Sequence, residues 1–178
     1  MSYNIEQLEI GQNAEFSKTI SESDVYLFAG VTGDMNPAHI NAEYSKDSVF
    51  NQRVVHGMLS ASLISTVLGT ELPGRGTIYL QQEVKFVAPV HFGDTITATV
   101  EVLEKNIKKN RVKLRTVCTN QEGQVVVDNR YPTEKIIKII LFHFIPLQVL
   151  MFEGSIERKN EVTEIILTSR RLVRAAFV

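Results

Sequence analysis

Only one cysteine, Cys118, occurs among the 178 residues, so no disulfide can form within the chain. This scarcity favours a cytoplasmic protein, in which Cys118 is expected to be a buried, unreactive thiol. The polar amino terminus, residues 1–12, lacks the basic and then apolar pattern of a secretory signal. The most apolar stretch, residues 136–152, is interrupted by a lysine, a histidine and a proline. It is a poor membrane span, because a spanning helix needs about 20 apolar residues.

An excess of charge of one sign is also missing. The chain has 19 basic and 20 acidic residues, and its formal net charge is -1. With no basic stripe and no nucleic-acid-binding motif, we expect neither a nucleic-acid partner nor attraction to an anionic membrane. No spacing of Cys, His and Asp is typical of a metal site, and no Gly-x-Ser-x-Gly elbow of a serine hydrolase occurs. We therefore expect no metal.

A change of hydrophobic period along the chain indicates the fold class. From Gly57 to Leu72, apolar residues cover most of the circumference of a helix, which predicts a buried helix that Pro73 and Gly74 end. Elsewhere, alternation of apolar and polar residues predicts strands within 14–19, 78–88, 96–102 and 112–118, and one that begins at Val125. Consecutive strands joined by short turns are typical of an antiparallel meander. The sequence therefore predicts an α+β fold with the sheet wrapped around the helix.

Local signals also place a helix before the buried one. Ser21, with Asp24 three residues later, is a capping-box pattern that opens a short helix through Val31. Gly33 is expected to end this helix, because glycine tolerates the left-handed conformation of a helix terminus.

Asp34 and His39 form a candidate acid–base pair. On a regular helix, residues five apart would point to different sides, but Asn36-Pro37 lies between them, and the residue before a proline avoids the helical region. A turn can bring both side chains onto one concave surface, where a carboxylate and an imidazole can exchange the protons of a hydration reaction. The alternative is that Asp34 is a turn residue and His39 a structural histidine.

The start of the predicted buried helix, Val55-His56-Gly57-Met58, is a second candidate element. Free N–H groups at a helix amino terminus can stabilise a developing oxyanion, and Gly57 would let a carbonyl approach the backbone. Alternatively, Gly57 only permits close packing between helix and sheet. His56 either contacts a ligand or braces the loop. Ser65, farther along the helix, either lines a substrate cavity or bonds back to its own turn.

Three ordered segments resemble the MaoC-like (R)-specific enoyl-CoA hydratases: FAGVTGDMNPAH at 28–39, VHGM at 55–58, and LPGRGTIYL at 72–80. The similarity runs from about Ile5 to Asp128. This resemblance implies a hotdog fold, an antiparallel sheet wrapped around a central buried helix. It also implies a homodimer with its sites near the subunit interface.

The resemblance also implies an activity: reversible conversion of trans-2-enoyl-CoA and (R)-3-hydroxyacyl-CoA by a hydro-lyase. No metal or redox cofactor is implied, and coenzyme A is part of the acyl-CoA thioester substrate. In this comparison Asp34 and His39 hold the water and Asn36 helps to position them. Gly57 N–H would bind the thioester oxygen, and Ser65 would lie at the site. Alternatives on the same fold are an acyl-carrier-protein dehydratase and an acyl-CoA thioesterase.

The carboxyl end departs from the resemblance. Asn129-Arg130-Tyr131-Pro132 interrupts the expected final strand, because proline cannot donate to a ladder. We therefore expect a MaoC-like domain at 1–128 and an atypical extension at 129–178. Residues 136–152 are compatible with a buried helix, an added strand or an exposed apolar segment, and 136–141 are candidates for the missing strand. This unusual end also keeps open a non-catalytic acyl-CoA-binding module.

Overall fold

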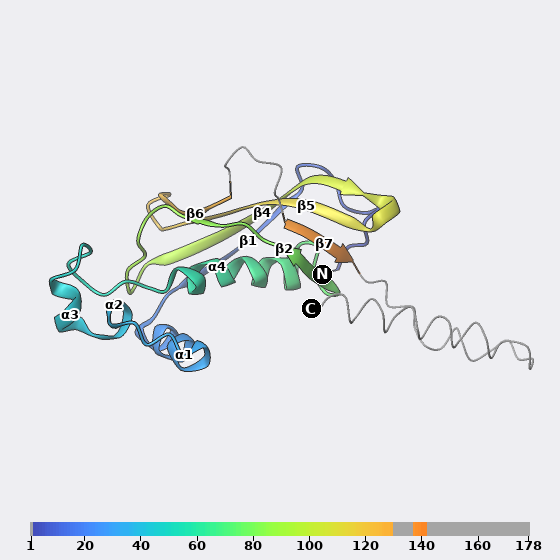
Figure 1. Ribbon diagram of the computed structural model, residues 1–178. Coiled ribbons are helices and arrows are strands. Elements are labelled where there is room, and N and C mark those ends of the chain that lie inside the picture. The colour runs from blue at the N-terminus through green and yellow to red at the C-terminus, as the bar shows by residue number, and fades with distance from the viewer. Residues whose placement is uncertain (1, 130–136, 142–178) are drawn as a thin grey trace, which may run out of the picture. The chain divides into compact units, whose positions relative to one another are not determined.

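The long buried helix that the sequence predicts is present and lies along one face of a curved antiparallel sheet (Figure 1). The computed structural model describes residues 2–129 and 137–141. In it, helix α4 (Gly57–Thr66) continues into the π-helical segment Val67–Glu71, so the predicted helix is confirmed to within one residue. None of the helices in the described residues is long and apolar enough to cross a bilayer.

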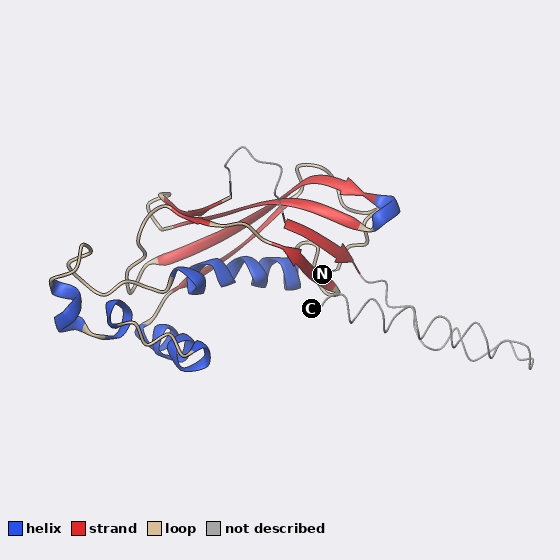
Figure 2. Ribbon diagram, in the orientation of Figure 1, coloured by secondary structure: helices blue, strands red, loops and turns tan. Residues whose placement is uncertain are grey.

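The sheet is formed by strands whose order differs from their order in the chain (Figure 2). The strands in the described residues are β1 (Asn13–Thr19), β2 (Thr77–Gln81), β3 (Lys85–Phe86), β4 (Thr95–Asn106), β5 (Arg111–Thr119), β6 (Val125–Asp128) and β7 (Ile137–Leu141). They pair in the order β1-β4-β5-β6-β3, and β7 pairs with both β5 and β2. All of these ladders are antiparallel, as predicted. The predicted run 78–88 is not one strand, because it divides into β2 and β3.

The core lies between α4 and the sheet. Every second residue is buried along β4 as far as Val102 and along β5, which confirms the alternation in the sequence. The helix packs its buried residues against β1, β4, β5 and β6. The main members of this core from helix and sheet are Ala61, Leu63, Ile64, Ile96, Val100, Val102, Leu114 and Cys118. Each fully buried Val, Leu or Ile side chain stabilises the fold by roughly 1.5–3 kcal/mol relative to an exposed one. Met58 is exposed, however, so the first turn of α4 is not buried on all sides.

Three short helices gather beside the amino-terminal end of α4 (Figure 1). They are α1 (Glu22–Thr32), α2 (Pro37–Ile40) and α3 (Ala42–Lys46). The predicted capping box of Ser21 and Asp24 opens α1, and Gly33 ends it in the left-handed conformation at φ 79°. These local signals therefore fix where the chain leaves α1 and enters the following turn.

Strand β7 shows how the atypical carboxyl end joins the sheet. It confirms the added strand among the predictions for residues 136–152, of which 136 and 142–152 lie outside the described residues. On β5, Val117 pairs with Asp128 and Leu114 pairs with Ile137. Three steps along β5 therefore correspond to nine steps between the partners, six more than an uninterrupted strand would need. The interruption predicted after Asp128 is confirmed, and the sheet nevertheless continues beyond it.

Candidate active site

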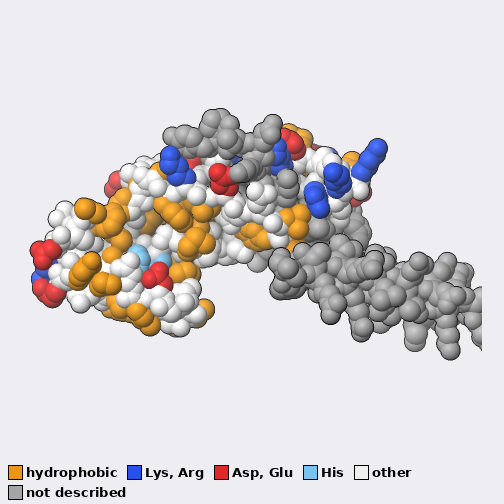
Figure 3. Space-filling model, in the orientation of Figure 1, with side chains coloured by type: hydrophobic (Ala, Val, Ile, Leu, Met, Phe, Trp, Pro, Cys, Tyr) orange, Lys and Arg blue, Asp and Glu red, His pale blue; other side chains and the backbone are white. Residues whose placement is uncertain are grey.

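A cavity of about 800 Å³ opens at the amino-terminal end of α4. On this face, histidine and acidic side chains are surrounded by hydrophobic ones (Figure 3). Polar lining residues come from the turn after α1, from α2 and from the start of α4, and apolar ones come also from β3 and β6. The lining from the polar segments includes Asp34, Asn36, His39, His56 and Gly57. The apolar lining includes Phe28, Phe50, Met58, Phe86 and Val127. The fold thus joins in one cavity the two sequence elements singled out for chemistry.

Asp34 is presented to the cavity by the turn that follows Gly33. Its backbone N–H donates to the Thr32 hydroxyl at 3.3 Å, and its Oδ1 accepts from the Asn36 N–H at 3.2 Å. The side chain is 52% exposed, so water can reach the carboxylate. The local hydrogen bonds therefore orient Asp34 without burying it.

His39 reaches the cavity from α2, which Pro37 begins and the Asn36 side chain caps by accepting from the Ala38 N–H at 3.1 Å. The ring Nδ1 lies 2.7 Å from the main-chain oxygen of Val54. Because a carbonyl oxygen can only accept, Nδ1 carries the hydrogen of the neutral ring. Nε2 is then unprotonated and free to accept a proton.

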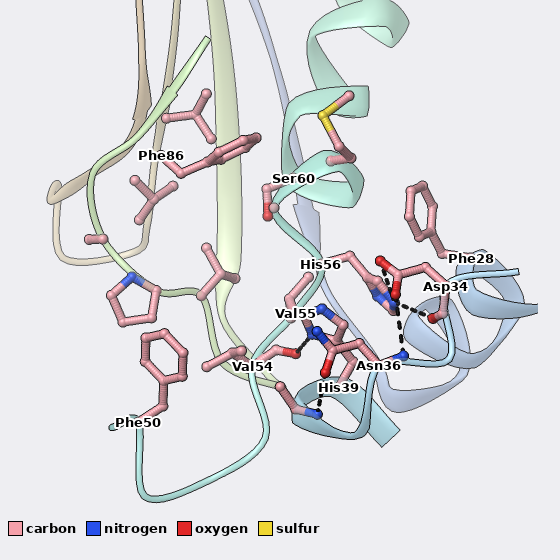
Figure 4. A pocket seen from close by; sticks show the side chains of 18 of the residues that line it. Phe28, Asp34, Asn36, His39, Phe50, Val54, Val55, His56, Ser60 and Phe86 are labelled. Carbon is pink, nitrogen blue, oxygen red and sulfur yellow. Dashed lines mark hydrogen bonds and ion pairs between the residues drawn. The ribbon is translucent and has the colours of Figure 1, made fainter. Parts of the chain in front are cut away.

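His56 lies behind this pair and is only 2% exposed (Figure 4). Its Nε2 donates to the main-chain oxygen of Asp34 at 3.0 Å. Its ring stacks on that of His39, with centroids 3.8 Å apart and planes at 33°, and lies 5.0 Å from the ring of Phe28. His56 therefore contacts both members of the candidate pair.

Among the described residues, Asp34, His39 and His56 form a group that could also hold a metal ion. One potential ligand atom from each lies within 4.8 Å of the other two. Yet one nitrogen of each ring already donates to a main-chain carbonyl, at Val54 and at Asp34. A three-ligand site through His56 Nε2 would have to break the bond to Asp34, whereas proton exchange at the Asp34 carboxylate and His39 Nε2 requires no such change.

Gly57 is the first residue of α4, so its N–H has no acceptor within the helix. A Cβ at this position would lie 2.9 Å from two ring atoms of Phe86. The absence of a side chain therefore permits close packing against β3, which was one of the two interpretations of this glycine. The second interpretation, a carbonyl bound at the free N–H, remains a prediction.

Known proteins of similar sequence identify the family of this chain. A family model described as the MaoC-like domain matches residues 6–124. This chain belongs to the MaoC-like dehydratase family. It is 54% identical over 123 residues to an (R)-specific enoyl-CoA hydratase of Rhodospirillum rubrum, covering 69% of this chain and 85% of that protein. It is 42% identical to a 3-hydroxybutyryl-CoA dehydratase of Methylorubrum extorquens, covering 69% and 78%.

A solved structure supports the same assignment. The unliganded R-hydratase of Pseudomonas aeruginosa superposes with a TM-score of 0.70 at 45% identity, covering 78% of this chain and 84% of that one. The predicted hotdog fold, a sheet wrapped around α4, is thereby confirmed.

Ser65, which was predicted to lie at the MaoC-like site, is not among the residues that line this cavity. Ser65 is exposed on α4 and hydrogen-bonds to Tyr79 of β2, away from the cavity lining. Burial raises the pKa of Tyr79 to about 12, and the bond from Ser65 opposes this shift. Ser60, which the sequence analysis missed, lines the cavity instead and is 1% exposed. Its hydroxyl has no hydrogen-bond partner in the part of the chain that the structure describes. The signal that points to it is its place one helical turn after Gly57.

Proposed function

We propose that this chain is an (R)-specific enoyl-CoA hydratase, a hydro-lyase that interconverts trans-2-enoyl-CoA and (R)-3-hydroxyacyl-CoA. The observation that carries this proposal is the convergence of the Asp34 carboxylate and the His39 imidazole at the amino terminus of α4. Sequence similarity to the hydratase of Rhodospirillum rubrum and the dehydratase of Methylorubrum extorquens supports the same reaction.

Water is activated between Asp34 and His39. As the water oxygen bonds to C3 of the enoyl group, the π bond between C2 and C3 is lost and the pair accepts the water proton. The pair then returns a proton to C2, so that both groups end in their starting states. His39 suits this exchange because its Nδ1 hydrogen is committed to Val54, which leaves Nε2 as the reactive atom.

The thioester oxygen gains negative charge when C3 is attacked. The free N–H of Gly57 and the partial positive charge of the α4 amino terminus stabilise that charge. Asn36 supports the reaction indirectly, since it caps the short helix that carries His39. No metal or redox cofactor takes part in this scheme.

The substrate is a short or medium acyl-CoA thioester, with the apolar wall that includes Phe86 and Val127 receiving apolar parts of it. The hydratase domain occupies residues 1–128, and the extension 129–178 contributes β7 to its sheet. We expect the enzyme to act in the cytoplasm, where the Cys118 thiol stays reduced.

The active form is a homodimer. Exposed apolar side chains on α1, Leu27 and the 87%-exposed Val31, support this, since clustered apolar surface marks protein contacts. Light scattering should give twice the chain mass of 20.0 kDa, and the double variant Leu27→Glu/Val31→Glu should be monomeric. A monomeric wild-type chain with full activity would reject the dimer.

The reaction is tested by following the enoyl absorbance of crotonyl-CoA with the purified chain and determining the configuration of the product. Water addition that gives (R)-3-hydroxybutyryl-CoA is expected. Release of free thiol would instead indicate a thioesterase, and a strong preference for crotonyl-acyl-carrier protein would indicate a carrier-protein dehydratase. Tight binding of acyl-CoA without water addition would indicate a binding module.

A further inference from the structure

His56 has almost no surface to offer a substrate, although it lies at the centre of the candidate site. It is 2% exposed, and its side chain is enclosed by His39 on one side and Phe28 on the other. This position is therefore poorly suited to a direct substrate contact, which was one of the roles predicted from the sequence. Its contacts instead reach both residues of the proton-exchanging pair.

The hydrogen bond from His56 fixes its tautomer. Nε2 faces the main-chain oxygen of Asp34 at 3.0 Å, and a carbonyl can only accept, so Nε2 carries the hydrogen. The Asp34 Oδ2 is farther from this nitrogen, at 3.9 Å. The bond therefore holds the backbone of Asp34 and leaves Oδ2 of the carboxylate available to water, while Oδ1 accepts from the Asn36 N–H.

The stacked ring of His56 constrains His39 in a different way. The Nδ1 bond to Val54 fixes one edge of the His39 ring but allows the ring to tilt about that bond. The face of His56, with its centroid 3.8 Å away, limits this tilt. Together the two contacts aim His39 Nε2 in one direction.

We propose that His56 is a positioning residue that holds Asp34 through its Nε2–H and His39 through ring stacking, without touching substrate (Figure 4). This inference rests on the proposed function, in which Asp34 and His39 exchange the protons. The two contributions are separable by substitution. Gln at position 56 keeps an N–H donor of equal reach but removes the ring, whereas Phe keeps a stacking ring but removes the donor.

Both His56→Gln and His56→Phe should lower kcat roughly 10–100-fold, because displacement of a catalytic group by about 1 Å has effects of this size. KM for crotonyl-CoA should change less than about threefold, since substrate contacts are retained. His91→Phe is the matched control, a histidine replaced outside the cavity lining, and should retain wild-type kcat.

Double variants separate positioning from a general loss of structure. In an Asp34→Asn background, His56→Phe should have little further effect, because its donor acts through Asp34. In a His39→Gln background, His56→Gln should likewise add little. Losses that multiply in both backgrounds, or single variants within twofold of wild type, would overturn the proposal.

A measurement on the unmodified protein covers the case in which the variants do not fold. Nitrogen-15 NMR of the histidine rings near neutral pH should show hydrogen on Nε2 of His56 and on Nδ1 of His39. The opposite tautomer at His56 would overturn the inference even if the wild-type enzyme is a hydratase. Absence of wild-type hydration would overturn the proposed function, and the role of His56 with it.

Discussion

His39 and Val54 are joined by a 2.7 Å hydrogen bond from the imidazole Nδ1 to the main-chain oxygen. This bond gives the neutral ring a defined tautomer, and His39 lines the same cavity as Asp34. Because Val54 immediately precedes the Val55-His56-Gly57 segment, the helix start and the proton-exchanging pair are fixed to one another.

Removing either proton-exchanging group should abolish most turnover. Asp34→Asn and His39→Gln should each lower kcat by roughly 10²–10⁴-fold, the usual range for lost acid–base groups. Far-ultraviolet circular dichroism should be unchanged, since neither side chain belongs to the buried core. Near-normal hydration of crotonyl-CoA by both variants would reject their roles.

Gly57→Ala should distinguish the two interpretations of this glycine. The new Cβ would meet the Phe86 ring at 2.9 Å and would also crowd the N–H at the helix start. We expect kcat/KM to fall at least tenfold, and Gly57→Ala/Phe86→Ala to fall as far below Phe86→Ala alone, because the crowding of the N–H persists. Gly69→Ala, where a Cβ has nothing within 4 Å, is the control. Recovery in the double variant would assign Gly57 to packing alone.

Ser60 and Ser65, both on α4, should respond differently to alanine. Ser65→Ala removes an exposed hydroxyl that contacts Tyr79, so kcat should stay within about twofold of wild type. Ser60→Ala removes a buried hydroxyl without a partner in the described residues, which should raise the unfolding temperature slightly. Differential scanning calorimetry and the enoyl assay measure both effects. A large loss of turnover in Ser65→Ala would restore that residue to the site.

Stability should decrease in alkali. Burial raises the pKa of Cys118 from 9.0 to about 12 in the folded chain. Below pH 9 the thiol is protonated in both the folded and the unfolded chain, so the stabilisation that the buried thiol contributes is fully present there. Between pH 9 and 12 the unfolded chain ionises first, so the free energy of unfolding falls by roughly 1.4 kcal/mol per pH unit at most.

Urea titrations at pH 7 and 10 measure this decrease. Cys118→Ala should reduce the difference between the two pH values, leaving mainly the contribution of Tyr79, whose pKa is also raised. An unchanged difference would assign the alkaline loss to other groups.

Two truncations test the part played by β7. A chain that ends at Asp128 lacks this strand, so β2 and the Arg111–Leu114 part of β5 lose their pairing with β7, although β5 still pairs with β4. It should unfold at a lower temperature and aggregate more readily, because unpaired strand edges associate. A chain that ends at Leu141 retains β7 and should resemble the full chain in both properties. Equal stability of the two truncations would show that β7 adds nothing.

Local sequence was sufficient to predict the framework that carries the site. Ser21, Asp24 and Gly33 act on neighbours within four residues, so both ends of α1 could be predicted from the sequence alone. Strands could likewise be predicted from the alternation of apolar and polar residues, because successive side chains of a strand point to opposite faces of the sheet. The Asn36-Pro37 pair likewise indicated that no regular helix runs from Asp34 to His39.

Only the tertiary structure decided how distant segments meet. The contacts of His56 with Asp34, of Phe86 with Gly57 and of β7 with β2 join residues far apart in the chain. The choice of Ser60 over Ser65 for the cavity depended on the rotation of α4 against the sheet, which a helix with apolar residues around most of its circumference does not specify. The sequence by itself determined the elements and the reactive groups, because those depend on local conformation and side-chain chemistry. Their mutual placement depended on packing between elements, a property of the whole folded chain.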